Sequence, residues 1–160
     1  MEKVLVTGAT GYIALHCIHQ LLNQGYAVNG SLRSPERKDE IIEALKKDNT
    51  PVENLSLFTF NLTEDDGWDE GMEGCDFLLH VASPLSINTH DEDYFVKPAV
   101  SGVKRAFKFA KKHNVKKVIL TSSVAAILET GEDKQYFDET DWSDPESSEI
   151  SHYSKSKTCL

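Results

Sequence analysis

The chain lacks the features that mark membrane, disulfide-rich or nucleic-acid-binding proteins. Its three cysteines are widely spaced and include no C-x-x-C pair, which excludes a disulfide framework and a zinc site. No apolar run approaches the roughly 20 residues of a membrane helix, and Val4 to Val6 is too short for a signal peptide. Positive charge is scarce, because 17 Lys and Arg face 26 Asp and Glu, for a net charge of -9. We therefore expect a cytoplasmic protein with buried, reduced thiols and with neither a membrane nor a nucleic-acid partner.

Histidine offers no convincing metal site either. His16 and His19 lie one helical turn apart, but no third ligand with suitable spacing accompanies them. His80 falls in the apolar run Phe77 to Ala82, where a hydrogen-bonded core histidine is expected. We predict that the chain binds no metal.

Short apolar runs alternate with helical patterns along the 160 residues, a length that predicts about one domain. Strands are predicted at Lys3 to Thr7, Tyr26 to Leu32, Leu55 to Phe60, Asp76 to Val81 and Lys117 to Thr121, and helices at Gly11 to Asn23, Pro35 to Lys47, Asp65 to Met72 and Asp91 to His113. This alternation implies parallel strands joined by right-handed crossovers, hence a doubly wound α/β sheet of Rossmann type. Pro98 should kink or delay the last helix, and the acidic stretch Thr130 to Ser148 should be a surface loop.

The first strand leads into a glycine-rich turn, Thr7-Gly8-Ala9-Thr10-Gly11, and then into an amphipathic helix. Gly8 and Gly11 would let a bound group approach the backbone, and Ala14 is small enough for the helix to pack on the sheet. The free N–H groups at the start of the helix would then face a pyrophosphate. An ordinary strand-to-helix turn is the alternative, but the position directly after the first strand favours nucleotide binding.

A Tyr and a Lys four residues apart occur near the other end, in Tyr153-Ser154-Lys155-Ser156-Lys157. Such a pair shares one face of a helix, so the ammonium can lie beside the phenol and favour its phenolate. Tyr153 is therefore a candidate proton donor near neutral pH. For Lys157 the plain alternative is an exposed helix lysine.

Together, the turn at residues 7–14 and the Tyr153-x-x-x-Lys157 pair resemble the extended short-chain dehydrogenase/reductase family, in its dihydroflavonol reductase, cinnamoyl-CoA reductase and ketone/aldehyde reductase branch. Further matches follow in the same order at Val28 to Arg33, His80 to Pro84, Val96 to Val100 and Thr121 to Ser123. Members of this family are much longer. The resemblance therefore implies that residues 1–160 are an incomplete dinucleotide-binding domain, without the C-terminal substrate-binding part.

The residues after the second strand should indicate the choice of cofactor, because an acidic residue there binds the ribose of NAD and an Arg binds the 2′-phosphate of NADP. No carboxylate occurs from Val28 to Pro35, and the resemblance places Arg33 and Arg37 around the phosphate. Two guanidinium groups can fork onto one phosphate, so we predict NADP(H). The alternative is a pair of solvated arginines that Glu36 and Asp39 neutralise.

The resemblance also assigns the other residues of the site. It implies cofactor contacts from the glycine-rich turn, the end of the third strand and the end of the fourth, namely Gly8, Thr10, Gly11, Tyr12, Ile13, Asn61, Leu62, Val81, Ala82 and Ser83. Asn61 departs from the usual Asp, and Ser101 stands where many relatives have Asn.

For catalysis, the resemblance implies that Ser123 holds a substrate carbonyl, Tyr153 protonates the forming alkoxide, and Lys157 lowers the pKa of Tyr153 and binds the nicotinamide ribose. Ser122 is the neighbouring alternative to Ser123, and a turn that caps the next segment is the structural alternative for both. These residues predict an NADPH-dependent reductase that converts a small-molecule ketone or aldehyde to an alcohol.

Two other functions stay open. One is an NAD-dependent sugar-nucleotide epimerase or dehydratase, which Arg33 and the stretch Val81 to Pro84 disfavour. The other is a non-catalytic nucleotide-binding module or an inactive fragment, and we expect little turnover from the 160 residues alone. The sequence defines neither the substrate nor the oligomeric state.

Overall fold

A computed structural model describes residues 1–83, 92–130 and 134–160 of the chain. The chain divides into two compact units. The first comprises Met1–Ala82 and Arg105–Thr121, and the second comprises Ser83–Lys104 and Ser122–Leu160. Pro84, which belongs to one of the motifs above, lies outside the described residues.

The first unit is built on a parallel sheet with the strand order β3-β2-β1-β4-β5. Its strands are β1 (Lys3–Val6), β2 (Ala27–Leu32), β3 (Leu55–Thr59), β4 (Phe77–His80) and β5 (Lys117–Leu120). Because β1 lies between β2 and β4, the segments that follow β1 and β4 leave the sheet side by side, at the point where the strand order reverses. Ligands of open α/β sheets bind at this point. The predicted doubly wound α/β fold is confirmed.

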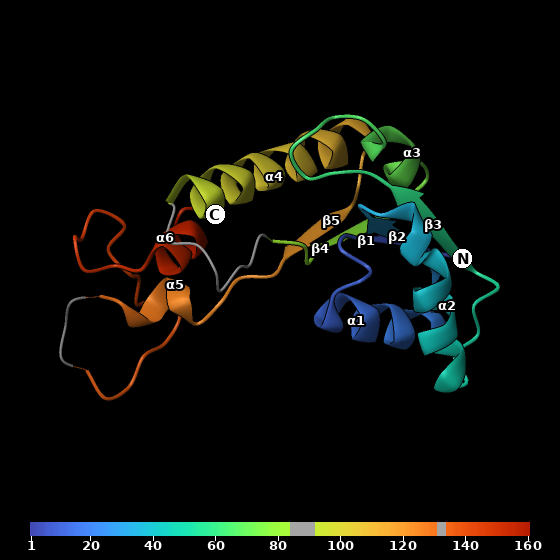
Figure 1. Ribbon diagram of the computed structural model, residues 1–160, viewed down its shortest axis with the longest axis horizontal. Helices are drawn as coiled ribbons and strands as arrows, with labels where there is room; N and C mark the ends of the chain where they lie inside the picture. Colours follow the sequence, from blue (N-terminus) through green and yellow to red (C-terminus); the bar gives the residue numbers. More distant parts are fainter. Residues whose placement is uncertain (84–91, 131–133) are drawn as a thin grey trace. The chain divides into compact units, whose positions relative to one another are not determined.

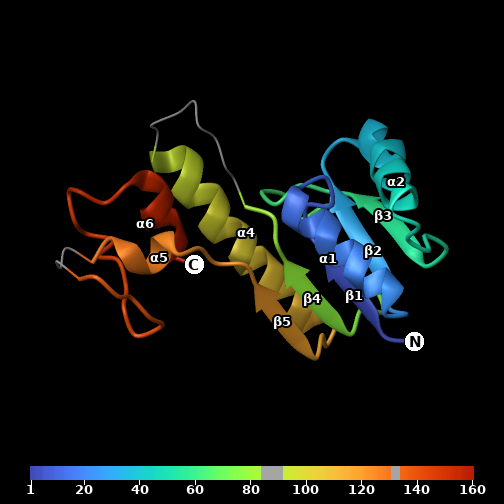
Figure 2. The same cartoon turned by 90° about the horizontal axis from the view of Figure 1, so that it is seen from below.

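Helices cover both faces of this sheet (Figure 1). One face carries α1 (Tyr12–Asn23) and α2 (Lys38–Lys47), which follows a single 3-10 turn, η1 (Pro35–Arg37). The other face carries α3 (Trp68–Met72) and the C-terminal part of α4 (Glu92–Lys112). The view from below also shows α4 beside β4 and β5 (Figure 2).

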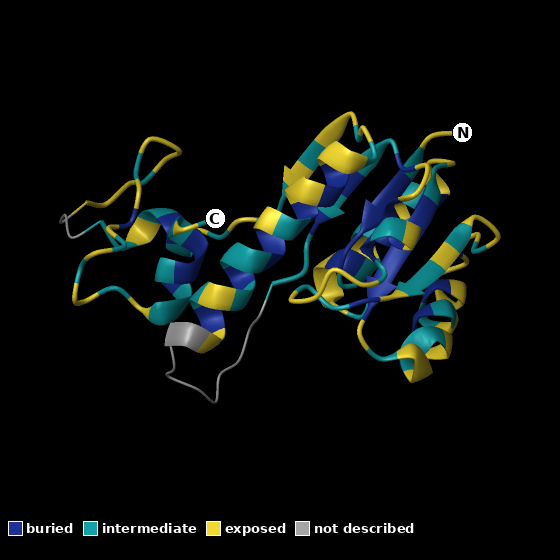
Figure 3. Ribbon diagram, turned by 90° about the horizontal axis from the view of Figure 1, so that it is seen from above, coloured by how far each residue is buried: buried dark blue, intermediate teal, exposed yellow. Residues whose placement is uncertain are grey.

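Strand alternation divides the core between these faces. Val4 and Val6 of β1 pack in the cluster that includes Ile18 of α1, whereas Leu5 between them packs in the cluster that includes Trp68 of α3. Alternate side chains of a strand point to opposite faces, so a strand buried on both sides is apolar without interruption. Figure 3 shows the central strands coloured as buried.

The long helix decides between the two effects predicted for Pro98 only in part. Helix α4 runs from Glu92 to Lys112 with Pro98 inside it, so the helix does not begin late, whereas the kink stays a prediction. Proline removes one backbone hydrogen bond of a helix, and the remaining turns of a long helix tolerate that loss. The Ser101 hydroxyl donates to the carbonyl of Pro98 at 3.3 Å. None of the helices in the described part is long and apolar enough to cross a bilayer.

The second unit contains two short helices, α5 (Ala125–Leu128) and α6 (His152–Thr158). The described residues of the connecting segment, 134–148, form no helix or strand, as predicted. The segment is nevertheless anchored at Ser143, which is buried. The Ser143 hydroxyl donates to the Ala125 carbonyl and accepts from the Glu129 N–H. The prediction of a plain surface loop was therefore incomplete.

The three thiols are free and differ in their surroundings. Cys75 is buried, and burial raises the pKa of its thiol to about 11. Cys17 is half-buried, and Cys159 is exposed, so the expectation of buried thiols holds for Cys75 and is wrong for Cys159.

Candidate functional site

The glycine-rich turn presents the start of α1 without a cap. Gly8 has a φ of 76°, and its carbonyl accepts from the Gly11 N–H at 2.8 Å, which closes the turn. Gly11 is the N-cap of α1 and has no side chain to occupy the first N–H groups. Among the described residues, the N–H groups of Tyr12 and Ile13 have no hydrogen-bond acceptor. Uncapped N–H groups at the positive end of a helix are suited to an anion.

A hydroxyl fixes the turn against the end of β4. Thr7 Oγ1 accepts from the N–H groups of Val81 and Ala82, both at 3.1 Å, and lies 3.0 Å from His80 Nδ1. Because the two amides occupy the lone pairs of this oxygen, its proton is best placed toward His80 Nδ1. His80 is 3% exposed, so the predicted hydrogen-bonded core histidine is confirmed.

The same contact brings Ala82 directly over the turn. A Cβ on Gly8 would lie 2.9 Å from the Cβ of Ala82. Gly8 is therefore required twice, once for its positive φ and once for the approach of Ala82. Val81 and Ala82 thus lie beside the glycine-rich turn, and their contact with a cofactor stays a prediction.

The end of β2 is joined to the turn as well. The Gly8 N–H donates to Ser31 Oγ at 3.0 Å, and the Ala9 N–H donates to the Ser31 carbonyl at 2.7 Å. Arg33 follows two residues later, is exposed, and has no ion pair or hydrogen bond among the described residues. The segment after β2 therefore places a cation that is unpaired in the described chain, Arg33, near the glycine-rich turn.

The second predicted cation is already paired. Arg37 donates to both carboxylate oxygens of Glu40, with Nε and an Nη each at 2.7 Å. The alternative, in which Glu36 and Asp39 neutralise the arginines, named the wrong carboxylates, because Arg37 pairs with Glu40. On a helix, residues three apart share a face, whereas residues one or two apart do not.

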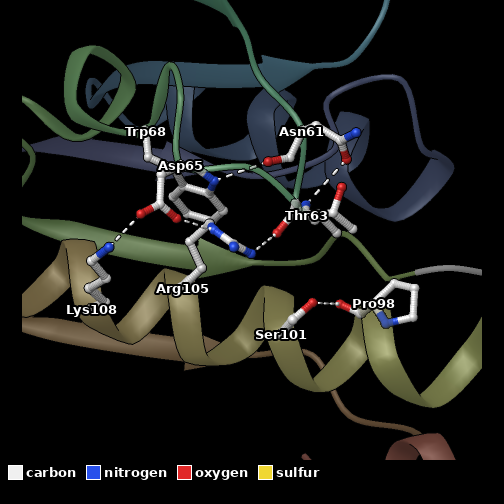
Figure 4. Close-up of polar contacts among 9 residues, drawn as sticks. Asn61, Thr63, Asp65, Trp68, Pro98, Ser101, Arg105 and Lys108 are labelled. Atoms are coloured by element: carbon white, nitrogen blue, oxygen red, sulfur yellow. Dashed lines mark hydrogen bonds and ion pairs between the residues drawn. The ribbon is translucent and has the colours of Figure 1, made fainter.

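Asn61 and Leu62 come after β3, and the carboxyl end of this parallel strand lies at the same edge of the sheet as that of β1. Figure 4 shows Asn61 with its hydrogen-bond partners. The indole N–H of Trp68 donates to the Asn61 carbonyl at 3.1 Å, and the Asn61 Oδ1 accepts from the Thr63 N–H at 3.3 Å. Trp68 is fully buried, so the position of Asn61 is fixed from inside the unit.

In the second unit, Tyr153 and Lys157 lie on one face of α6, as their spacing predicted. The Lys157 ammonium lies 5.6 Å from the centroid of the Tyr153 ring. Tyr153 also contacts Phe95 edge to face, with ring centroids 6.4 Å apart. Lys157 is 5% exposed and has no carboxylate or hydrogen-bond partner among the described residues. Burial lowers the pKa of Lys157. The alternative of an exposed helix lysine is therefore wrong.

A carboxylate that the sequence did not single out holds this helix. Glu129 accepts from the Ser151 N–H at 2.7 Å and from the Ser154 hydroxyl at 2.6 Å. Burial alone would raise the pKa of Glu129, but the hydrogen bonds from Ser154 and Ser151 outweigh it and lower the pKa. Ser151 itself caps α6 by accepting from the Ser154 N–H. The Ser-x-x-Ser spacing could have revealed the cap, but nothing local links it to Glu129.

The two remaining serines have different surroundings. Ser123 Oγ accepts from the Ala125 N–H at 3.2 Å, the local bond expected of a residue that starts a turn. Ser83 Oγ is buried and has no hydrogen-bond partner in the described part of the chain. Ser123, Tyr153 and Lys157 belong to the second unit, whereas the phosphate turn, Arg33 and Ala82 belong to the first.

Comparison with known proteins places this site in a family. A sequence model of the NAD dependent epimerase/dehydratase family matches residues 4–160. Cinnamoyl-CoA reductase 1 of Petunia hybrida is 37% identical over 147 residues, which cover 91% of this chain and 43% of that protein. Anthocyanidin reductase of Arabidopsis thaliana is 37% identical over 128 residues, which cover 79% of this chain and 37% of that protein.

Among solved structures, yeast methylglyoxal/isovaleraldehyde reductase complexed with NADPH matches with a TM-score of 0.83 and 31% identity. The match covers 98% of this chain and 50% of the yeast chain. The chain thus spans half of this structure and less than half of the two plant reductases.

Proposed function

The chain belongs to the NAD dependent epimerase/dehydratase family, and on that premise we propose that it is the dinucleotide-binding part of an NADPH-dependent reductase. The proposed reaction converts a ketone or an aldehyde to an alcohol. Its relatives include two plant reductases and a yeast reductase complexed with NADPH, which supports this reaction class.

The observation that carries the proposal is the free Arg33 at the end of β2. A carboxylate at this place would favour the ribose of NAD, whereas an unpaired guanidinium favours a 2′-phosphate. No carboxylate occurs between Val28 and Pro35, and the nearest paired arginine, Arg37, is occupied by Glu40. Arg33 is therefore the primary phosphate ligand in our proposal, and Arg37 is secondary.

The residues present fit a dinucleotide in other respects. The uncapped start of α1 would hold the pyrophosphate, and Val81 and Ala82 would lie along the nicotinamide ribose. The Ser83 hydroxyl and the Lys157 ammonium make no hydrogen bond within the described chain. A bound ribose, rich in hydroxyl groups, would supply such partners.

In the proposed reaction the bound cofactor supplies a hydride. Ser123 donates a hydrogen bond to the substrate carbonyl, and Tyr153 transfers its proton to the oxygen as negative charge develops there. Lys157, beside the Tyr153 ring, favours the phenolate that remains and thereby makes Tyr153 a better acid. Glu129 positions Tyr153 by holding the start of α6.

Titration of the 160-residue chain with NADPH and NADH tests the proposal. We expect NADPH to bind more tightly, by the equivalent of about 1.5 to 3 kcal/mol for a charge-assisted bond to the 2′-phosphate. Arg33→Ala should erase most of this preference, and Arg37→Ala should change it less. Glu40→Ala, which releases Arg37, should increase the preference. Equal affinity for both cofactors in the unaltered chain would contradict the assignment and favour the NAD-dependent alternative. Failure to bind either would leave no dinucleotide site.

A further inference from the structure

The loop that follows β3 is held by a side chain from α4. Arg105 donates from one Nη to the Leu62 carbonyl at 2.6 Å and from Nε to Asp65 Oδ1 at 2.5 Å (Figure 4). One guanidinium thus bonds the loop at two points three residues apart. All of these residues lie in the first unit.

Other contacts also hold the loop, but in the described part of the chain none of them involves the Leu62 carbonyl. Phe60 donates its N–H to the Leu32 carbonyl at 3.1 Å, and Gly67, with a φ of 81°, returns the chain toward α3. Trp68 holds the Asn61 carbonyl, one residue earlier. Among the described residues, Arg105 therefore supplies the hydrogen bond that fixes Leu62.

Lys108, one helical turn further along α4, provides a control for Arg105. Arg105 bonds both the Leu62 carbonyl and the Asp65 carboxylate, and a control variant should affect the second contact alone. Lys108 also pairs with Asp65, but among the described residues it makes no hydrogen bond to the backbone of the loop. The hydrogen bonds from Lys108 and then from Arg105 lower the pKa of Asp65, so the carboxylate stays charged at neutral pH. Lys108→Ala thus removes an ion pair to the loop and leaves the contact with Leu62 intact.

We propose that Arg105 is a positioning residue for the adenine end of the cofactor. This inference rests on the proposed function and on the cofactor contacts that the family resemblance implies for Asn61 and Leu62, which we take to lie against the adenine. Arg105 does not touch the ligand in this account. It fixes Leu62 before binding, so that the loop needs no ordering when the adenine arrives. Pre-organisation of this kind strengthens binding because ordering a loop is a cost of association.

The test measures binding of 2′,5′-ADP, which carries the adenine and the 2′-phosphate without the nicotinamide. We expect Arg105→Ala to weaken its affinity about tenfold, the scale of one lost hydrogen bond to a charged group. Lys108→Ala should stay within about twofold, because an exposed ion pair contributes little. NADPH and NADH should lose affinity by the same factor in Arg105→Ala, since the adenine is common to both and Arg33 is unchanged.

Thermal unfolding without ligand shows whether each variant is folded, and amide hydrogen exchange over residues 61–67 reports the loop directly. Faster exchange there in Arg105→Ala, with unchanged exchange in the sheet, is the expected result. Wild-type affinity of folded Arg105→Ala for 2′,5′-ADP would overturn the proposal, and so would an equal loss in Lys108→Ala. If the unaltered chain bound no 2′,5′-ADP, the proposed function itself would be wrong and this inference would be rejected with it.

Discussion

The contact between Gly8 and Ala82 makes a quantitative prediction about the phosphate turn. Gly8→Ala adds a Cβ to a residue with a φ of 76°, and that Cβ would lie 2.9 Å from Ala82 Cβ and 3.3 Å from Ala82 Cα. The first effect is backbone strain in the left-handed region, about 1 to 2 kcal/mol. The second is steric overlap in a packed interior, about 1 to 3 kcal/mol.

Gly25 separates the two effects. It has a φ of 83°, but a Cβ there would meet nothing within 4 Å. Gly25→Ala should therefore lower the free energy of unfolding by the strain alone, about 1 to 2 kcal/mol. Gly8→Ala should lower it by about 2 to 5 kcal/mol, and the difference between the two variants measures the overlap with Ala82.

Urea unfolding of both variants gives these free energies if the dependence on denaturant is unchanged. A second substitution, Ala82→Gly, removes the atom that the new Cβ meets. In the Gly8→Ala background it should recover much of the overlap, whereas in the Gly25→Ala background it should not. If Gly8→Ala proved no more destabilising than Gly25→Ala, Ala82 would not be packed on the turn and our account of the site would be wrong.

Three further predictions concern binding, pH and chemistry. Gly11→Val should abolish NADPH binding in a titration while circular dichroism shows an intact fold, because Gly11 has a negative φ and the branched side chain blocks the approach to the turn. Its Cβ would lie 3.2 Å from the Gly8 carbonyl oxygen, so a small local shift of the turn is expected as well. Glu129 has a lowered pKa when folded, so its contribution to stability is present above its unfolded pKa and is lost as the pH falls through the folded pKa. In Glu129→Gln the free energy of unfolding should therefore fall less steeply as the pH is lowered. An unchanged pH profile would contradict the role of Glu129 in holding α6. Aldehyde-dependent NADPH oxidation by residues 1–160 should be slow or absent, and Tyr153→Phe should remove whatever turnover is seen.

The sheet could be predicted because its signals are local. Most strands are short apolar runs, although β2 includes Asn29 and Ser31, and the alternation with helical patterns predicts parallel pairing without knowledge of distant contacts. One helix boundary was less accurate, at Pro35, where a 3-10 turn precedes α2. The helix predicted at Asp91 to His113 was placed well, because α4 runs from Glu92 to Lys112 and includes Pro98.

The supports of the site could not be predicted in the same way. Thr7 and His80 are 73 residues apart in sequence, and Leu62 and Arg105 are 43 apart. Sequence spacing defines neighbours within one helix or strand, but it does not define which side chain from a distant element reaches a carbonyl. The pairing of Arg37 with Glu40 is different, since the i,i+3 spacing already favoured it over Glu36 and Asp39.

The choice of lysine at position 157, in the second unit, is better explained by ligand binding than by the stability of the fold. The Lys157 side chain is 5% exposed and its ammonium contacts the Tyr153 ring, with no carboxylate beside it in the described chain. Burying a cationic side chain without an opposite charge costs free energy, and the lowered pKa of Lys157 is the sign of that cost. A core residue chosen for stability alone would be apolar at this position. In the proposed function the same ammonium binds ribose hydroxyls beside the Tyr153 ring, and such bonds are strongest where water is excluded. The burial that destabilises the free chain would therefore strengthen the hold of Lys157 on the cofactor.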